Sequence, residues 1–190
     1  ADLEQLAASG HRLNMEMAVT DEMVAICSRL RPAACCLVPE KRQELTTEGG
    51  LDVAGHLEQV KAATAVLASV GVEVSLFIDP DREQIRAAKE CGAPVIELHT
   101  GAYANAKGKD SARELRRLVD GAEFAHSLGI TVNAGHGIDY ENIQLMLKVP
   151  YLHELNIGYS IICRAIFTGL KHAVQEMLSN LNAYGKSGEN

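Results

Sequence analysis

The sequence predicts an α/β protein in which a parallel sheet is covered by helices. Short apolar runs rich in β-branched residues alternate with helical segments along the whole chain. The strand cores are almost continuously apolar, as expected for parallel strands that helices cover. No G-x-G-x-x-G fingerprint follows the first strand, which counts against an open doubly wound sheet. Polar residues follow each strand, and this placement favours a (β/α) barrel over the open sheet.

Six apolar runs are predicted to be strands because they are short and bounded by turn residues. They are Leu13–Val19, Ala33–Pro39, Val72–Asp79, Pro94–Thr100, Ile130–Ala134 and Glu154–Ser160.

Helices are predicted after each strand from their end signals. Thr20 or Asp21 can cap the first helix, and Pro80 opens a later one as a first-turn proline. Gly71 and Gly129 each end a helix at its carboxyl terminus. The predicted helices are Asp21–Leu30, His56–Ser69, Pro80–Glu90, Ser111–Leu128, Tyr140–Val149 and Cys163–Ala183.

The composition is that of one globular domain over residues 1–190, with 47% hydrophobic and 23% charged residues. A net charge of −7, no Trp and only 4% aromatic residues argue against nucleic acid as a partner. No apolar run approaches the roughly 18–20 residues that a membrane span needs. The five cysteines contain no C-x-x-C pair, which predicts a reducing compartment, the cytoplasm, and no zinc site.

Acid–base chemistry is predicted at the carboxyl ends of the strands, where parallel α/β proteins place their sites. Glu16 and Glu97 each lie inside an apolar strand, so both are expected to be buried. Burial raises a carboxyl pKa and suits proton transfer near neutral pH. The alternative is a carboxylate paired with a cation of a neighbouring strand. His136 lies between two glycines, which predicts an accessible imidazole.

Glycines after the last two strands predict a phosphate site. Gly137 follows His136, and Gly158 precedes the start of a helix, where free backbone N–H groups bind anions. A simple tight turn is the alternative. The long loop Pro39–Gly55 contains Thr46 and is predicted to be a lid over the substrate, with a solvated surface loop as the alternative.

Several segments resemble the pyridoxine 5′-phosphate synthase family from about residue 12 to residue 180. These segments are LNMEMAVT, CCLVPEKRQELTTEGGLDVAG, VSLFID, IELHTGAYA, VNAGHGI and HELNIGYSII. The resemblance implies a (β/α)8 TIM barrel that assembles as a homo-octamer. It also implies a transferase that condenses 1-deoxy-D-xylulose 5-phosphate with 3-amino-2-oxopropyl phosphate. The products are pyridoxine 5′-phosphate, phosphate and water, and neither a metal nor an organic cofactor is required.

The same resemblance implies roles for seven residues of this chain. Glu16 would be a general base, His136 a proton donor, and Glu97 a stabiliser of charged intermediates. Thr46 would hold the deoxyxylulose phosphate. The phosphate of the amino ketone would be held by Gly137, Gly158 and Tyr159.

The sequence departs from the family pattern in two respects. Tyr159 stands where the family commonly has a histidine, and a tyrosine cannot carry a positive charge. The family's first two strands, with an asparagine-isoleucine-aspartate-histidine motif, have no counterpart here, so this chain is expected to supply about six β/α units. A barrel typically has about 250 residues, against 190 here. The alternatives are a phosphosugar isomerase or aldolase with Lys41 as Schiff-base lysine, and an inactive synthase fragment.

Overall fold

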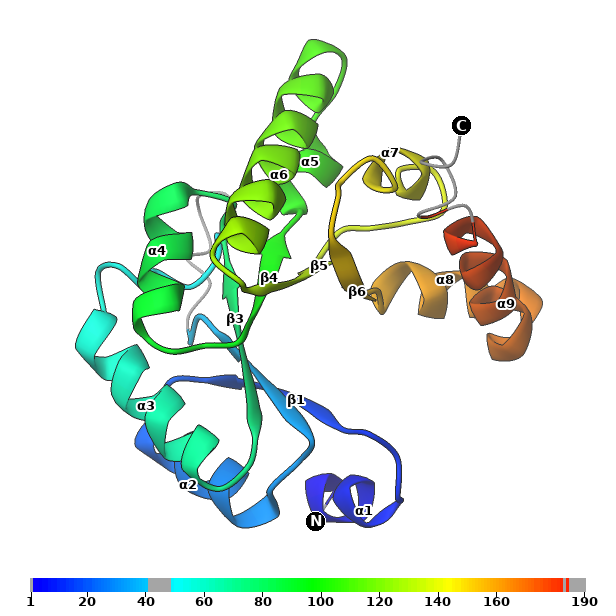
Figure 1. Cartoon of the computed structure of the whole chain (residues 1–190). Helices are drawn as coiled ribbons and strands as arrows, with labels where there is room; N and C mark the ends of the chain where they lie inside the picture. The colour runs from blue at the N-terminus through cyan, green and yellow to red at the C-terminus, as the bar shows by residue number, and fades with distance from the viewer. Residues whose placement is uncertain (1, 41–48, 183, 185–190) are drawn as a thin grey trace.

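The computed structural model describes residues 2–40, 49–182 and 184. Its centre is a six-stranded sheet in which every neighbouring pair is parallel and the strands follow chain order, β1 to β6 (Figure 1). The strands are β1 (Asn14–Ala18), β2 (Ala34–Val38), β3 (Glu73–Ile78), β4 (Val95–His99), β5 (Thr131–Gly135) and β6 (Leu152–Asn156). The prediction of a parallel α/β fold is therefore confirmed.

Helices lie between successive strands, before β1 and after β6 (Figure 1). They are α1 (Asp2–Ala8), α2 (Asp21–Leu30), α3 (Leu57–Ser69), α4 (Arg82–Glu90), α5 (Gly101–Asn105), α6 (Lys109–Ser127), α7 (Ile143–Met146), α8 (Tyr159–Thr168) and α9 (Leu170–Leu181). Of these, α2, α3, α4 and α6 pack on the outer face of the sheet, while α1 precedes β1 and α8 and α9 follow β6. Thr20 caps α2 as predicted, because its side chain accepts a hydrogen bond from the backbone N–H of Met23 (3.3 Å). None of the described helices is both long and apolar enough to cross a membrane.

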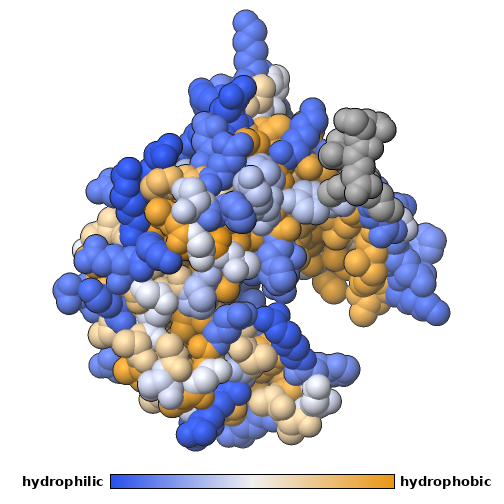
Figure 2. All heavy atoms as spheres, viewed as in Figure 1, coloured by the Kyte–Doolittle hydropathy of each residue, from blue (hydrophilic) through white to orange (hydrophobic). Residues whose placement is uncertain are grey.

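The sheet curls into a partial barrel. Strands that follow one another in chain order with helical crossovers are the topology of a (β/α) barrel. In the described part of the chain β1 and β6 are not paired with each other, and Figure 2 shows the molecule hollowed and open on one side. One side chain just before β1 contacts both β3 and β6. The Arg12 guanidinium contacts the carboxylates of Glu73 (2.8 Å) and Glu154 (3.4 Å).

The two faces of the strands have different chemistry because successive side chains alternate. Leu37, Leu76 and Leu98 are fully buried in the apolar core between sheet and helices. On the inner face, Cys36 of β2 and Glu97 of β4 contact each other instead. Because side chains alternate along each strand, one face of the sheet packs into the apolar core and the other lines a polar barrel interior.

The structure differs from the predicted elements mainly near the carboxyl end. The strand predicted to reach Ser160 ends at Asn156, and a helix begins at Tyr159. The single helix predicted over Cys163–Ala183 is two helices, because Gly169 breaks it with φ +81°. Helices α1 and α5 were not predicted, and α7 is shorter than its predicted range. Short apolar runs do not distinguish strand from helix by pattern alone, and this ambiguity explains the error after Asn156.

Candidate active site

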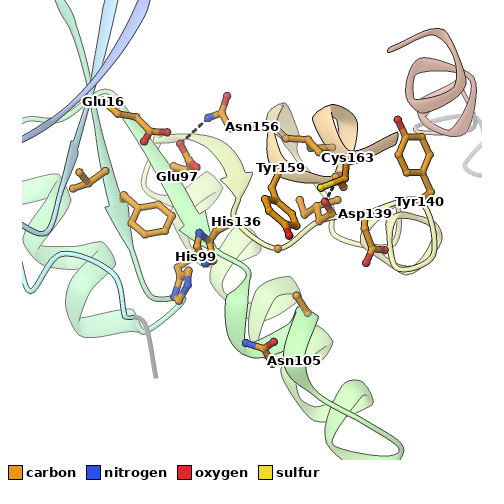
Figure 3. Close-up of a pocket in the computed structure, with 18 of the residues that line it drawn as sticks. Glu16, Glu97, His99, Asn105, His136, Asp139, Tyr140, Asn156, Tyr159 and Cys163 are labelled. Carbon is orange, nitrogen blue, oxygen red and sulfur yellow. Dashed lines mark hydrogen bonds between the residues drawn. The ribbon is translucent and has the colours of Figure 1, made fainter. Parts of the chain in front are cut away.

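One open cavity of about 1180 Å³ lies at the carboxyl ends of the strands (Figure 3). Six of the seven predicted site residues line it: Glu16, Glu97, His136, Gly137, Gly158 and Tyr159. The seventh, Thr46, and the alternative nucleophile Lys41 lie outside the described residues, as do residues 41–48 of the predicted lid. The strand ends thus bring together side chains that are more than 140 residues apart in the chain.

Glu97 is the most buried carboxylate of the cavity, with 3% of its surface exposed. Its Oε2 accepts hydrogen bonds from the Asn156 side-chain amide (2.6 Å) and from the Cys36 thiol (3.5 Å). Burial raises the pKa of Glu97 from 4.5 to about 7, and the negative charge of Glu16 adds to this rise. The bond from Asn156 acts in the opposite direction. A carboxyl group with this pKa can both accept and return a proton near neutral pH.

Glu16 lies on the inner face of β1, but its side chain is exposed. The expectation that it is buried is wrong. β1 is an edge strand in the described part of the sheet, so no strand beyond it covers this position. Figure 3 shows the Glu16 side chain directed into the cavity on the same side as Glu97 and Asn156.

His136 follows β5 and is half-buried at the cavity wall. Its backbone has φ +77°, an uncommon conformation for a residue with a side chain. Thr100 fixes the turn, because its hydroxyl donates a hydrogen bond to the backbone carbonyl of Gly135 (2.8 Å). The His136 ring packs against the ring of His99, with 5.2 Å between their centroids.

The two glycine loops lie on one side of the cavity. Gly137 has φ +81°, and Gly158 is the residue before α8, whose first turn has backbone N–H groups without helical partners. The Ser160 hydroxyl joins the loops by donating a hydrogen bond to the backbone carbonyl of Ile138 (2.8 Å). Tyr159 is 87% exposed at the start of α8. This arrangement offers an anion the positive end of a helix dipole.

Sequence reasoning missed the role of Cys36 as a hydrogen-bond donor to Glu97. No local signal could have found it, because the contact depends on the register of β2 against β3 and of β3 against β4. In the described part of the chain, no group of three or more His, Cys, Asp or Glu side chains is placed to hold a metal ion. The fold and the cavity thus define a barrel-type α/β protein with carboxylates, an imidazole and glycine loops at its strand ends.

Comparison with known proteins identifies the family. The family model described as "Pyridoxal phosphate biosynthesis protein PdxJ" matches residues 1–183. A curated protein from Aliivibrio fischeri named "Pyridoxine 5′-phosphate synthase" is 58% identical over 167 residues, which are 87% of this chain and 69% of that protein. The chain belongs to the PdxJ family of pyridoxal phosphate biosynthesis proteins.

Solved structures with low sequence identity share the fold alone. A xylose isomerase domain protein from Planctomyces limnophilus has a TM-score of 0.52 at 14% identity and covers 89% of this chain and 71% of its own. The Amycolatopsis orientalis BexX/CysO complex contains a chain with a TM-score of 0.58 at 20% identity, covering 87% of this chain and 62% of its own. These similarities agree with a barrel-type fold.

Proposed function

We propose that this chain is a pyridoxine 5′-phosphate synthase, a transferase. Its substrates would be 1-deoxy-D-xylulose 5-phosphate and 3-amino-2-oxopropyl phosphate, and its products pyridoxine 5′-phosphate, phosphate and water. The observation that carries the proposal is the meeting of Glu16, Glu97 and His136 in one cavity of a chain from this family. The reaction requires imine formation, dehydrations and ring closure, and each of these steps moves protons.

The roles follow from exposure and charge. Glu16 is exposed to the cavity and would act as the general base. His136, half-buried at the cavity wall, would donate protons. Glu97 is held by Asn156 beside the reaction space and would stabilise positively charged intermediates when it is ionised.

Phosphate recognition is proposed at two places. Gly137, Gly158 and Tyr159 would hold the phosphate of the amino ketone, since they surround the first turn of α8. Thr46 would hold the deoxyxylulose phosphate. Because Tyr159 provides a hydroxyl but no charge, we expect Tyr159→His to lower KM for the amino ketone and leave KM for the deoxyxylulose phosphate unchanged. Steady-state kinetics with each substrate varied in turn measure this, with Tyr151→His as an exposed control.

The test of the function is direct synthesis. Purified protein and the two substrates should release phosphate and form pyridoxine 5′-phosphate, detected by mass spectrometry. Glu16→Gln and His136→Asn should lower kcat by about 100-fold or more, as expected for groups that transfer protons. Full activity in both variants would refute the assigned roles.

We also propose that the barrel is completed by two further β/α units between β6 and β1, in a cytoplasmic homo-octamer. The unpaired edges of β1 and β6 in the described sheet support this proposal. A version extended by the family's amino-terminal strands should turn over far faster than the 190-residue chain. Equal activity of the two would refute the need for these strands. Sedimentation velocity measures the number of subunits.

A further inference from the structure

A second histidine adjoins the proposed proton donor. His99, the last residue of β4, has only 4% of its surface exposed, although its ring lines the cavity beside His136 (Figure 3). None of the roles proposed above involves it. A buried imidazole next to a reacting group either only fills space or also orients the neighbouring side chain. Its hydrogen bonds distinguish these two possibilities.

The carboxylate of Asp79 fixes which nitrogen of His99 carries a proton. Asp79 follows β3, and its Oδ1 lies 3.0 Å from Nδ1 of His99. Burial alone would raise the pKa of Asp79, but the hydrogen bond with His99, a backbone hydrogen bond from Gly50 and the charge of Arg117 together lower it. An ionised carboxylate only accepts hydrogen bonds, so Nδ1 of His99 is the donor. Nε2, on the side of the ring away from Asp79, lies next to Gly101.

The opposite side of the His99 ring faces Gly101 and His136. A Cβ atom at Gly101 would collide with Nε2 of His99 and approach Cδ2 of His136, so only glycine fits between α5 and the two rings. Phe77 packs edge-on against His99, with 5.0 Å between their centroids. Among the described residues, the titratable groups in contact with His99 are Asp79 and His136, and Glu97 lies two residues before it on the same face of β4.

We propose that Asp79 and His99 are a positioning pair that sets the orientation of the His136 imidazole. The proposal rests on the proposed function, because it assigns His136 as the proton donor. The Asp79 carboxylate holds the His99 imidazole by a hydrogen bond. The His136 imidazole packs against that of His99, with 5.2 Å between the ring centroids and an interplanar angle of 56°. The backbone of His136, with φ +77°, does not by itself select one orientation of the ring, so the ring of His99 contributes to that orientation beside the edge-on ring of Phe77 (6.3 Å between centroids).

The first test does not depend on turnover. In protein with ¹⁵N-labelled histidine, the neutral form of His99 should show a protonated Nδ1, and its ring should show an NOE to the ring of His136. Asp79→Asn should remove the tautomer preference and shift the His136 ring resonances. His99→Asn keeps an N–H donor toward Asp79 but removes the ring, so it should shift the same His136 resonances.

Asp81→Asn is the matched control. Asp81 lies two residues after Asp79, is exposed and pairs with Arg117 (3.0 Å). This variant should leave the ring resonances of both histidines as in the wild type. Unchanged His136 resonances in both Asp79→Asn and His99→Asn would overturn the proposal, and so would a His99 with Nδ1 unprotonated.

The second test uses kinetics of the active enzyme. Asp79→Asn and His99→Asn should each lower kcat about 10-fold or more with both KM values unchanged. Neither should lower kcat further when His136 is already replaced by Asn, because both act through that ring. Equal fold losses in the presence and absence of His136 would show a general structural effect and refute the proposal. Wild-type protein that makes no product contradicts the proposed function instead, and the NMR result then decides the positioning pair.

Discussion

Replacing Glu97 by glutamine should change how stability depends on pH. The unfolded chain has a glutamate carboxyl with a pKa near 4.5, whereas the folded chain has one at about 7. Between these values the folded state binds more protons than the unfolded state, so stability falls as the pH rises. The difference of 2.5 units corresponds to about 3 kcal/mol at 1.36 kcal/mol per unit. Glutamine has nearly the same shape and does not titrate.

Urea unfolding at a series of pH values measures this effect. The free energy of unfolding of Glu97→Gln minus that of the wild type should increase by about 3 kcal/mol from pH 4.5 to pH 8. Titrating groups that do not interact with Glu97 are common to the two proteins and cancel in the difference. Glu123→Gln removes an exposed carboxylate from α6 and serves as the control. A difference for Glu97→Gln that is constant across this pH range would refute the argument that burial raises the pKa of Glu97.

Three further predictions concern the surroundings of this site and the helix layer. Asn156→Leu removes a hydrogen bond to the ionised carboxylate, so the pKa of Glu97 should rise by about one further unit, measured by ¹³C NMR of its carboxyl group. Glu114→Gln should cost about 1–3 kcal/mol at pH 7 in urea unfolding. Burial alone would raise the pKa of Glu114, but hydrogen bonds from two α6 arginines lower it, so this cost should disappear as the pH falls through the folded-state pKa. Gly135→Ala should lower stability by about 1–3 kcal/mol, because the new methyl group would collide with the Glu97 carboxylate. Gly158→Ala meets open space and should change stability by less than about 0.5 kcal/mol; equal losses in the two glycine variants would contradict this reasoning.

Local patterns were sufficient to locate the strands and their polar ends. Apolar runs bounded by turn residues located all six strands, and the parallel topology followed from the helices between them. Glu97 was found because it is a carboxylate inside an apolar strand, and His136 because it follows a strand between two glycines. The prediction failed where a run was apolar but short. The segment after Asn156 enters α8, none of whose residues is buried, so its apolar character did not reflect a place in the sheet.

Burial and contact could not be predicted because they depend on residues far apart in the chain. The sequence treated Glu16 and Glu97 alike, since both lie in apolar strands. The sheet gives them different environments. Glu97 lies in the central strand β4 and accepts a hydrogen bond from Asn156, whereas Glu16 lies on the edge strand β1. The environment of each carboxylate is set by the register of neighbouring strands.

The sequence by itself therefore determined the α/β class, the order of the strands and the edge of the sheet at which polar groups gather, because these depend on residues close together in the chain. Only the tertiary structure decided that Glu97 is the buried carboxylate, that Cys36 and Asn156 hold it, and that Asp79 fixes the ring of His99. These contacts join different strands, and the way the sheet curls brings their side chains within hydrogen-bonding distance.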